Sequence, residues 1–232
     1  MEYHNPVLLK ETVDGLNIKP DGVYVDVTFG GGGHSKEILR RLGPNGKLFA
    51  FDQDEDALAN ALPDERFVLI NDNFRHIKRF LRFHGARSVD GILGDLGVSS
   101  HQFDVPERGF STRFDAELDM RMSQKNDLNA YKVVNEYDDA NLRRVFYYYG
   151  ELKNAPALSR TIIEAREHRP IKTTDELKEV LAKYLPERVR NKILAQIYQA
   201  IRIEVNQEMD VLKEFLEQSL DCLLYTSPSP RD

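Results

Sequence analysis

Three short segments of the sequence, at the glycine run, at Asp52 and at Asp95, carry residues that could bind and align a nucleoside ligand. Four consecutive glycines, Gly30 to Gly33, follow an alternating apolar stretch and precede a helical pattern that begins near His34. Glycine lets a ligand approach the backbone closely, and a helix start offers free N–H groups and a partial positive charge. Asp52 follows about twenty residues later, where a carboxylate can accept hydrogen bonds from ribose hydroxyls. This spacing predicts a ligand that contains a nucleoside.

The glycine spacing argues against a nicotinamide dinucleotide or a nucleoside triphosphate. The dinucleotide fingerprint G-x-G-x-x-G would place its third glycine at Ser35 or Lys36, and the phosphate loop requires Gly-Lys-Ser/Thr where this chain has Gly33-His34-Ser35. S-adenosylmethionine, which has no phosphate, fits the pattern. The alternative is a tight turn that binds nothing, with His34 acting only as a helix cap. The conformational entropy that four glycines lose on folding disfavours that alternative.

Asp95 is the candidate catalytic residue. It follows an apolar stretch, Val89 to Leu93, that is typical of a buried strand. Its carboxylate could accept a hydrogen bond from a substrate amino group, and acids suit a cationic sulfonium. Methyl transfer is an in-line displacement that depends more on alignment than on strong acid–base chemistry, and we expect no metal. The alternative role for Asp95 is a turn or helix-cap acid.

These residues need a parallel sheet to bring them together. Strand patterns at residues 23–27, 47–51, 67–70 and 89–93 alternate with helical patterns at 35–42, 56–62 and 74–84. That alternation predicts a parallel sheet covered by helices on both faces, with ligands bound outside the carboxyl ends of the strands. The glycine run, Asp52, Asn71 to Phe74, and Asp95 all fall at such ends.

The second half of the chain has a different pattern. Residues 104–121 look like a loop rich in both charge signs, and helical periods follow from about Leu128, including a capping box at Thr173-x-x-Glu176. This predicts a helical subdomain inserted after the fourth strand. We expect the aromatic run at residues 146–149 to pack inside it, with base stacking as the alternative. The candidates for phosphate contacts with RNA are the loop arginines, Arg108, Arg113 and Arg121.

Composition limits the classes of function. The chain has 232 residues, 41% hydrophobic and 30% charged, with a net charge of −6 and one cysteine, Cys222. These values fit a globular protein with a real core and a reducing, cytoplasmic location, and no apolar run is long enough for a membrane span. Because nucleic-acid binders are usually basic where they contact their ligand, RNA binding would have to rest on a local patch. The basic residues between Arg75 and Arg87 fit a solvated helix face.

Several motifs together resemble the bacterial 16S ribosomal RNA (cytosine-N4)-methyltransferase family. The resemblance covers about residues 4–220, and its motifs are HNPVLL, DVTFGGGGHS, FDQD, DGILGDLGVSSHQFD, ERGFS, LDMRM and QAIRIEVN. It implies a class I (Rossmann-like), S-adenosylmethionine-dependent methyltransferase with an inserted helical domain. It also implies methylation of the N4 amino group of a cytidine in the decoding region of 16S rRNA, within the assembled small ribosomal subunit.

The resemblance also implies roles for individual residues. Asp52 would hold the cofactor's ribose hydroxyls, and Phe74 would stack near its adenine. DLGVSS stands where many amino-methylating enzymes have an Asp/Asn-Pro-Pro-aromatic motif, so the group that positions the cytosine amino group stays open, with Asp95 as candidate. The cofactor-binding set that the family implies is Gly32, Gly33, His34, Asp52, Phe74, Asp95 and Gln102.

The chain departs from the family pattern in three places. His101 follows the paired serines where a proline is usual, and LAQIYQAIRI lacks the basic-proline pattern. The family continues past Leu220 into further strands, whereas this chain ends in DCLLYTSPSPRD, so we expect a missing natural C-terminus, a foreign tail and an incomplete sheet. The expected divisions are residues 1–103 for cofactor binding, 104–205 for the insertion, 206–220 for a returning helix and 221–232 for a disordered tail.

Other functions stay open at this point. The chain could methylate another substrate, or it could be a non-catalytic RNA-binding or ribosome-assembly protein that retains the cofactor fold. A nicotinamide-linked dehydrogenase is disfavoured by the glycine spacing. The sequence does not decide the oligomeric state, for which a homodimer is one alternative.

Overall fold

The computed structural model describes residues 8–223 and divides the chain into two compact units. The first comprises the residues up to Gly97 and those from Asp210 onward, and the second runs from Val98 to Met209. The first boundary therefore lies six residues before the expected one at 103, because the segment from Val98 to residue 103 belongs to the helical unit. None of the helices in the described range is both long enough and apolar enough to cross a membrane.

The first unit contains a parallel sheet. Within residues 8–223 its strands are β1 (Val23–Asp26), β2 (Lys47–Phe51), β3 (Phe67–Ile70) and β4 (Gly91–Leu93), in the order β3-β2-β1-β4. That order matches the 3-2-1-4 portion of the Rossmann sheet, in which the strand order reverses at β1. The predicted α/β class is confirmed.

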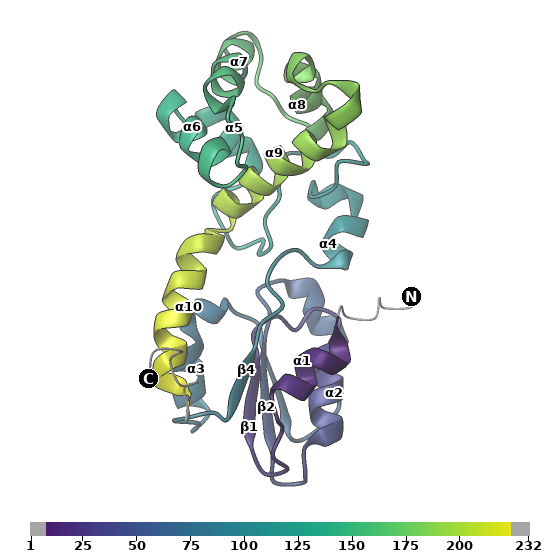
Figure 1. Cartoon of the computed structure of the whole chain (residues 1–232), viewed down its shortest axis with the longest axis vertical. Coiled ribbons are helices and arrows are strands. Elements are labelled where there is room, and N and C mark those ends of the chain that lie inside the picture. The colour runs from purple at the N-terminus through teal and green to yellow at the C-terminus, as the bar shows by residue number, and fades with distance from the viewer. Residues whose placement is uncertain (1–7, 224–232) are drawn as a thin grey trace. The chain divides into compact units, whose positions relative to one another are not determined.

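Alternating side chains on the strands give the sheet two apolar faces. Val25 and Phe49 point to one face, where they pack with residues of α3 (Ile77–Phe83) and α10 (Glu208–Cys222). Tyr24 and Leu48 point to the other face, where α1 (Leu9–Gly15) and α2 (Gly33–Arg41) lie. Figure 1 shows these helix pairs on opposite sides of the strands. Because neither face is solvated, the strands are apolar throughout and their polar residues are confined to the ends.

Two connections in this unit are 3₁₀ turns where the sequence predicted α-helix. η1 (Glu55–Asn60) is capped by the Asp54 side chain, which accepts a hydrogen bond from the backbone N–H of Asp56, and Pro63 follows soon after. η2 (Phe74–His76) leads directly into α3. A short segment between a cap and a proline has no room for a full α-helix.

The end of α10 corrects the expectation of a tail beginning at residue 221. Helix α10 continues to Cys222, whose side chain is buried, and Leu223 forms a parallel bridge with Val89. The Val89 N–H donates to the Cys222 carbonyl over 2.8 Å. Residues 221–223 are therefore ordered parts of the first unit. Residues 224–232, and residues 4–7 of the HNPVLL motif, lie outside the described residues.

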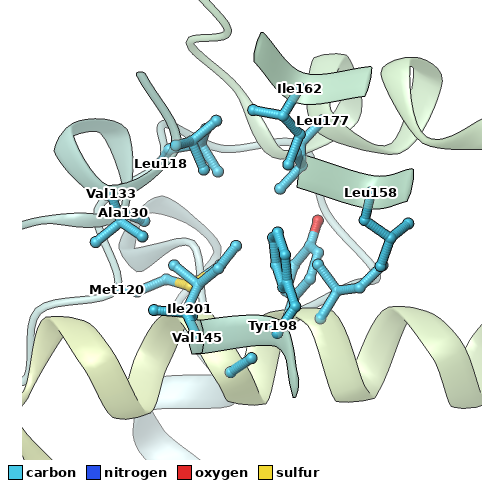
Figure 2. Close-up of a cluster of buried hydrophobic side chains, with 14 of the residues drawn as sticks. Leu118, Met120, Ala130, Val133, Val145, Leu158, Ile162, Leu177, Tyr198 and Ile201 are labelled. Carbon is cyan, nitrogen blue, oxygen red and sulfur yellow. The ribbon is translucent and has the colours of Figure 1, made fainter. Parts of the chain in front are cut away.

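The second unit is built from helices around one apolar core. Tyr198 and Ile201 of α9 (Arg190–Val205) lie among Met120, Val145 and Leu158, and all five are at most 4% exposed (Figure 2). The predicted capping box at Thr173 and Glu176 is present at the start of α8 (Thr174–Val180). The elements of this unit are α4 (Ser100–Asp104), η3 (Pro106–Arg108), α5 (Ala130–Glu136), α6 (Asp139–Tyr148), α7 (Ala155–His168), α8 (Thr174–Val180), η4 (Ala182–Tyr184), η5 (Glu187–Val189) and α9 (Arg190–Val205).

Asn206 ties two of the sequence motifs together. It ends QAIRIEVN, is 4% exposed, and bonds the backbone of the LDMRM segment at two points. Its Oδ1 accepts from the Met122 N–H over 2.7 Å, and its Nδ2 donates to the Met120 carbonyl over 2.8 Å. Met120 has a positive φ of 58°, which an L-residue rarely adopts. Because this segment is irregular, its backbone groups are not paired by the regular hydrogen bonds of a helix or a strand. The amide of Asn206 supplies hydrogen bonds to two of them.

The aromatic run at residues 146–149 divides between core and surface. Phe146 is fully buried, as predicted, and Tyr149 is partly buried against the core. Tyr147 and Tyr148 are 55% and 71% exposed, so the prediction that the whole run packs inside was wrong for these two residues. They occupy the outward side of the last turn of α6.

Candidate functional site

The glycine run forms an open turn between β1 and α2. Gly30 and Gly32 have φ values of +50° and +74°, in the left-handed region. A Cβ at Gly32 would lie 2.9 Å from the Phe29 ring, whereas nothing lies within 4 Å of a Cβ position at Gly30. Gly32 is therefore required by packing, and Gly30 leaves bare backbone facing open space. Over the described residues, the first turn of α2 has no side-chain cap, so its N–H groups stay available.

Asp52 lies directly against this turn. One carboxylate oxygen, Oδ2, accepts from the Gly30 N–H over 2.8 Å, and Oδ1 accepts from the Asp54 N–H over 2.9 Å. Burial raises the pKa of Asp52 to about 6, although both backbone hydrogen bonds act in the opposite direction. The carboxylate is thus held in place while retaining lone pairs for further donors. The predicted proximity of Asp52 to the glycine run is present.

The end of β3 supports the same corner of the sheet. The Asn71 amide donates to the backbone carbonyl of Asp52 over 3.0 Å, which ties the β3 end to the β2 end. Phe74 follows three residues later and is partly buried, with its ring edge-on to Phe215 of α10 at a centroid separation of 5.2 Å. Its assignment to adenine stays a prediction.

Asp95 is exposed and is connected to the β1 end by its backbone. Its N–H donates to Oγ1 of Thr28 over 2.7 Å, one residue beyond the ladder bond in which the Val27 N–H donates to the Leu93 carbonyl. The ends of β1 and β4 are therefore adjacent, as the predicted topology requires. The hydrogen bonds described so far connect the ends of all four strands in one region of the first unit.

Asp26 is a buried acid in this region that sequence reasoning missed. It is the last residue of β1 and is 0% exposed. Its Oδ2 accepts from the Ser35 hydroxyl over 2.7 Å, and its Oδ1 accepts from the Thr28 N–H over 3.1 Å. Burial raises the pKa of Asp26. The available signal was a single acid in an otherwise apolar strand, which we interpreted as one position of an alternating pattern.

The side chain of His34 has a buried polar atom that a polar ligand could pair with. It lies in the first turn of α2 and is 6% exposed, and its Nε2 is buried without a hydrogen-bond partner among residues 8–223. A buried polar atom without a hydrogen-bond partner destabilises the folded protein, so most such atoms are paired. A bound ligand can supply the partner that His34 lacks within the described residues. The side chain is not the cap of α2. Together with the open backbone at Gly30 and the Asp52 carboxylate, His34 fits a ligand that carries both hydroxyl and charged groups.

The other predicted site residues belong to the second unit. Gln102 is buried in α4, where its side chain accepts from the Ser99 N–H over 3.1 Å and completes a capping box. Arg108 donates to the carbonyl of Arg121 over 2.9 Å, so this part of the segment is anchored. Arg121 in turn pairs with Asp119 over 2.7 Å. Arg113 is 63% exposed at its side chain and forms an ion pair with a similarly exposed carboxylate, that of Asp104.

Comparison with known proteins shows the family of the chain. Three relatives are named ribosomal RNA small subunit methyltransferase H, and this chain is 88% identical to the protein from Flavobacterium johnsoniae over 223 residues, which are 96% of the chain and 74% of that relative. It is 78% identical to the Flavobacterium psychrophilum protein, over 93% of the chain and 74% of the relative. It is 53% identical to the Bacteroides thetaiotaomicron protein, over 96% of the chain and 73% of the relative. The model of the MraW methylase family matches residues 1–227, and the chain therefore belongs to that family.

Proposed function

We propose that this protein transfers a methyl group from S-adenosylmethionine to the N4 amino group of a cytidine in the decoding region of 16S rRNA. The observation that supports this most is the hydrogen bond between Asp52 and Gly30, which fixes a ribose-binding acid against an open glycine turn. Membership of a methylase family and relatives named for small-subunit ribosomal RNA supply the reaction and the substrate class. We also propose the cytoplasm as its location and the assembled small subunit as its partner.

The residues of the first unit have distinct roles in this proposal. Asp52 accepts hydrogen bonds from the ribose hydroxyls, and the N–H groups of the first turn of α2, with His34, bind the amino-acid end. Phe74 lies against the adenine. S-adenosylmethionine supplies an electrophilic methyl group on a sulfonium, which leaves as a neutral thioether. Asp95 accepts a hydrogen bond from the cytosine amino group and orients its nitrogen. As the new C–N bond forms and the methyl–sulfur bond breaks, one amino proton would pass to the Asp95 carboxylate and from there to solvent.

The RNA contacts are assigned to the second unit. Arg113 is exposed and positioned for phosphate, while Arg108 and Arg121 contribute mainly by holding the backbone of their own segment. Gln102 is retained in the cofactor set only through the family resemblance. A protein with a net charge of −6 can bind rRNA in this way because contact depends on local cations.

The test is methyl transfer to the proposed substrate. The protein is incubated with radiolabelled S-adenosylmethionine and small ribosomal subunits from cells that lack the modification, and the rRNA is then digested to nucleosides. The proposal predicts label in N4-methylcytidine from the decoding region. Label in another nucleoside or in protein would indicate a different substrate, and subunit binding without label would indicate a non-catalytic assembly role.

A further inference from the structure

A continuous series of hydrogen bonds joins the cofactor side of the site to Asp95. It begins at Ser35 in α2, whose hydroxyl donates to Oδ2 of Asp26 over 2.7 Å. The other oxygen of Asp26 accepts from the Thr28 N–H over 3.1 Å, and Oγ1 of Thr28 accepts from the Asp95 N–H over 2.7 Å. Three hydrogen bonds thus connect the helix after the glycine run to the loop after β4.

Asp95 depends on this connection because its own segment is irregular. Residues 94–99 lie outside helix and strand, and the segment includes Gly97 with a φ of +142°, a conformation that L side chains rarely adopt. Asp95 is exposed and is the second residue after β4. The bond to Thr28 fixes the Asp95 backbone relative to the β1 end, just beyond the last ladder bond between Val27 and Leu93.

The main chain at Thr28 is also fixed by hydrogen bonds. Its N–H bonds a carboxylate that is fully buried, so the acceptor cannot move toward solvent. The neighbouring Phe29 N–H donates to the Phe51 carbonyl over 2.9 Å, which fixes the backbone that follows. With the main chain constrained on both sides, rotation about χ1 is the freedom left to the Thr28 hydroxyl oxygen, and β-branching restricts it.

We propose that Thr28 is a positioning residue, which sets the place of Asp95 through its hydroxyl and couples it to the glycine turn through Asp26. The inference rests on the proposed function, since it assigns Asp95 to the methyl-accepting amino group. A displacement of about 1 Å at a reacting group can cost on the order of a hundredfold in rate. Loss of the Thr28 hydroxyl therefore lowers turnover without removing any group that contacts the cofactor.

The test compares Thr28→Val with Thr28→Ser. Valine keeps the shape and removes the acceptor, whereas serine keeps the acceptor. We expect Thr28→Val to lower kcat for methyl transfer roughly 10- to 100-fold, with a smaller rise in the Kd for S-adenosylmethionine because Asp95 also belongs to the cofactor-binding set, and Thr28→Ser to restore most of kcat. Equal losses in the two variants, or wild-type kcat in Thr28→Val, would overturn the proposal.

Two further measurements separate positioning from general destabilisation. Hydrogen exchange at the Asp95 amide should be at least about tenfold faster in Thr28→Val than in the wild type or Thr28→Ser, and unchanged exchange would contradict the proposal. The double variant Thr28→Val/Asp95→Ala should be no slower than Asp95→Ala alone, because Thr28 acts through Asp95, and multiplicative losses would overturn it. If the wild type transfers no methyl group, the proposed function and the role of Thr28 in it both fail, whereas normal transfer with unaffected variants rejects only Thr28.

Discussion

Replacing Asp52 by asparagine tests the ribose site at its most constrained residue. The carboxylate accepts one N–H at each oxygen, from Gly30 at 2.8 Å and from Asp54 at 2.9 Å. Asparagine has one acceptor oxygen and would turn an NH₂ group toward one of these donors, so it loses a loop hydrogen bond as well as the charge. Losing charge-assisted bonds to the ribose costs about 2–3 kcal/mol, which weakens cofactor binding about 30- to 150-fold.

The raised pKa of Asp52 adds a pH dependence with a definite sign. With a pKa of about 6, the carboxylate is mostly ionised at pH 7 and mostly protonated at pH 5. Only the ionised form can accept from both ribose hydroxyls while it keeps its backbone donors. The Kd of the wild type for S-adenosylmethionine should therefore rise about tenfold between pH 7 and pH 5.

Titration calorimetry across this pH range measures both effects. Asp52→Asn should bind weakly and with little pH dependence, which would attribute the wild-type profile to this group. Asp54→Asn is the matched control for affinity, because it removes the same charge two residues away and asparagine can still cap η1. Its pH profile should move toward lower pH, since the Asp54 charge contributes to the raised pKa of Asp52. Wild-type affinity in Asp52→Asn, or a flat wild-type profile between pH 5 and 7, would refute the assignment.

Three other substitutions test separate parts of the structure. Asp26→Asn should raise the melting temperature of the cofactor-free protein at pH 7 by at least about 2 °C, because ionising a buried acid disfavours the folded state. The gain should grow as pH rises through the raised pKa of Asp26, and a lower melting temperature would contradict this. Asn206→Ala should cost about 2–4 kcal/mol in denaturant unfolding, whereas the exposed Asn141→Ala should stay within about 0.5 kcal/mol, and equal losses would argue against the buried amide. Arg113→Gln should weaken binding to the small subunit and reduce the slope of log binding constant against log salt concentration by about one, while Arg121→Gln should mainly lower stability. An unchanged slope for Arg113→Gln would remove Arg113 from the contact surface.

The sheet could be predicted because its signals are local. Each strand is a short apolar run ended by polar or glycine residues. Parallel pairing then places Asp52 and Asp95 together at the carboxyl ends of the strands. Strand β4 is shorter than the predicted residues 89–93: its ladder with β1 covers Gly91 to Leu93, and Val89 forms an isolated bridge with Leu223.

The features that could not be predicted depend on contacts between distant residues. Asp26 looks like an ordinary position in an alternating strand, and its burial arises only when Ser35 and the glycine turn fold over it. Arg108 sits in a charged, irregular segment that suggests exposure, yet its guanidinium group bonds the carbonyl of Arg121, thirteen residues along the chain. Nothing local in a run of tyrosines indicates which of them α6 turns outward.

A crystal structure with bound S-adenosylhomocysteine would examine the proposed pocket directly. We predict that both ribose hydroxyls lie within hydrogen-bonding distance of the Asp52 carboxylate, with the amino-acid end against the first turn of α2 and near His34. Density for the nucleoside away from the ends of β1, β2 and β4 would contradict the assignment of these residues to the cofactor.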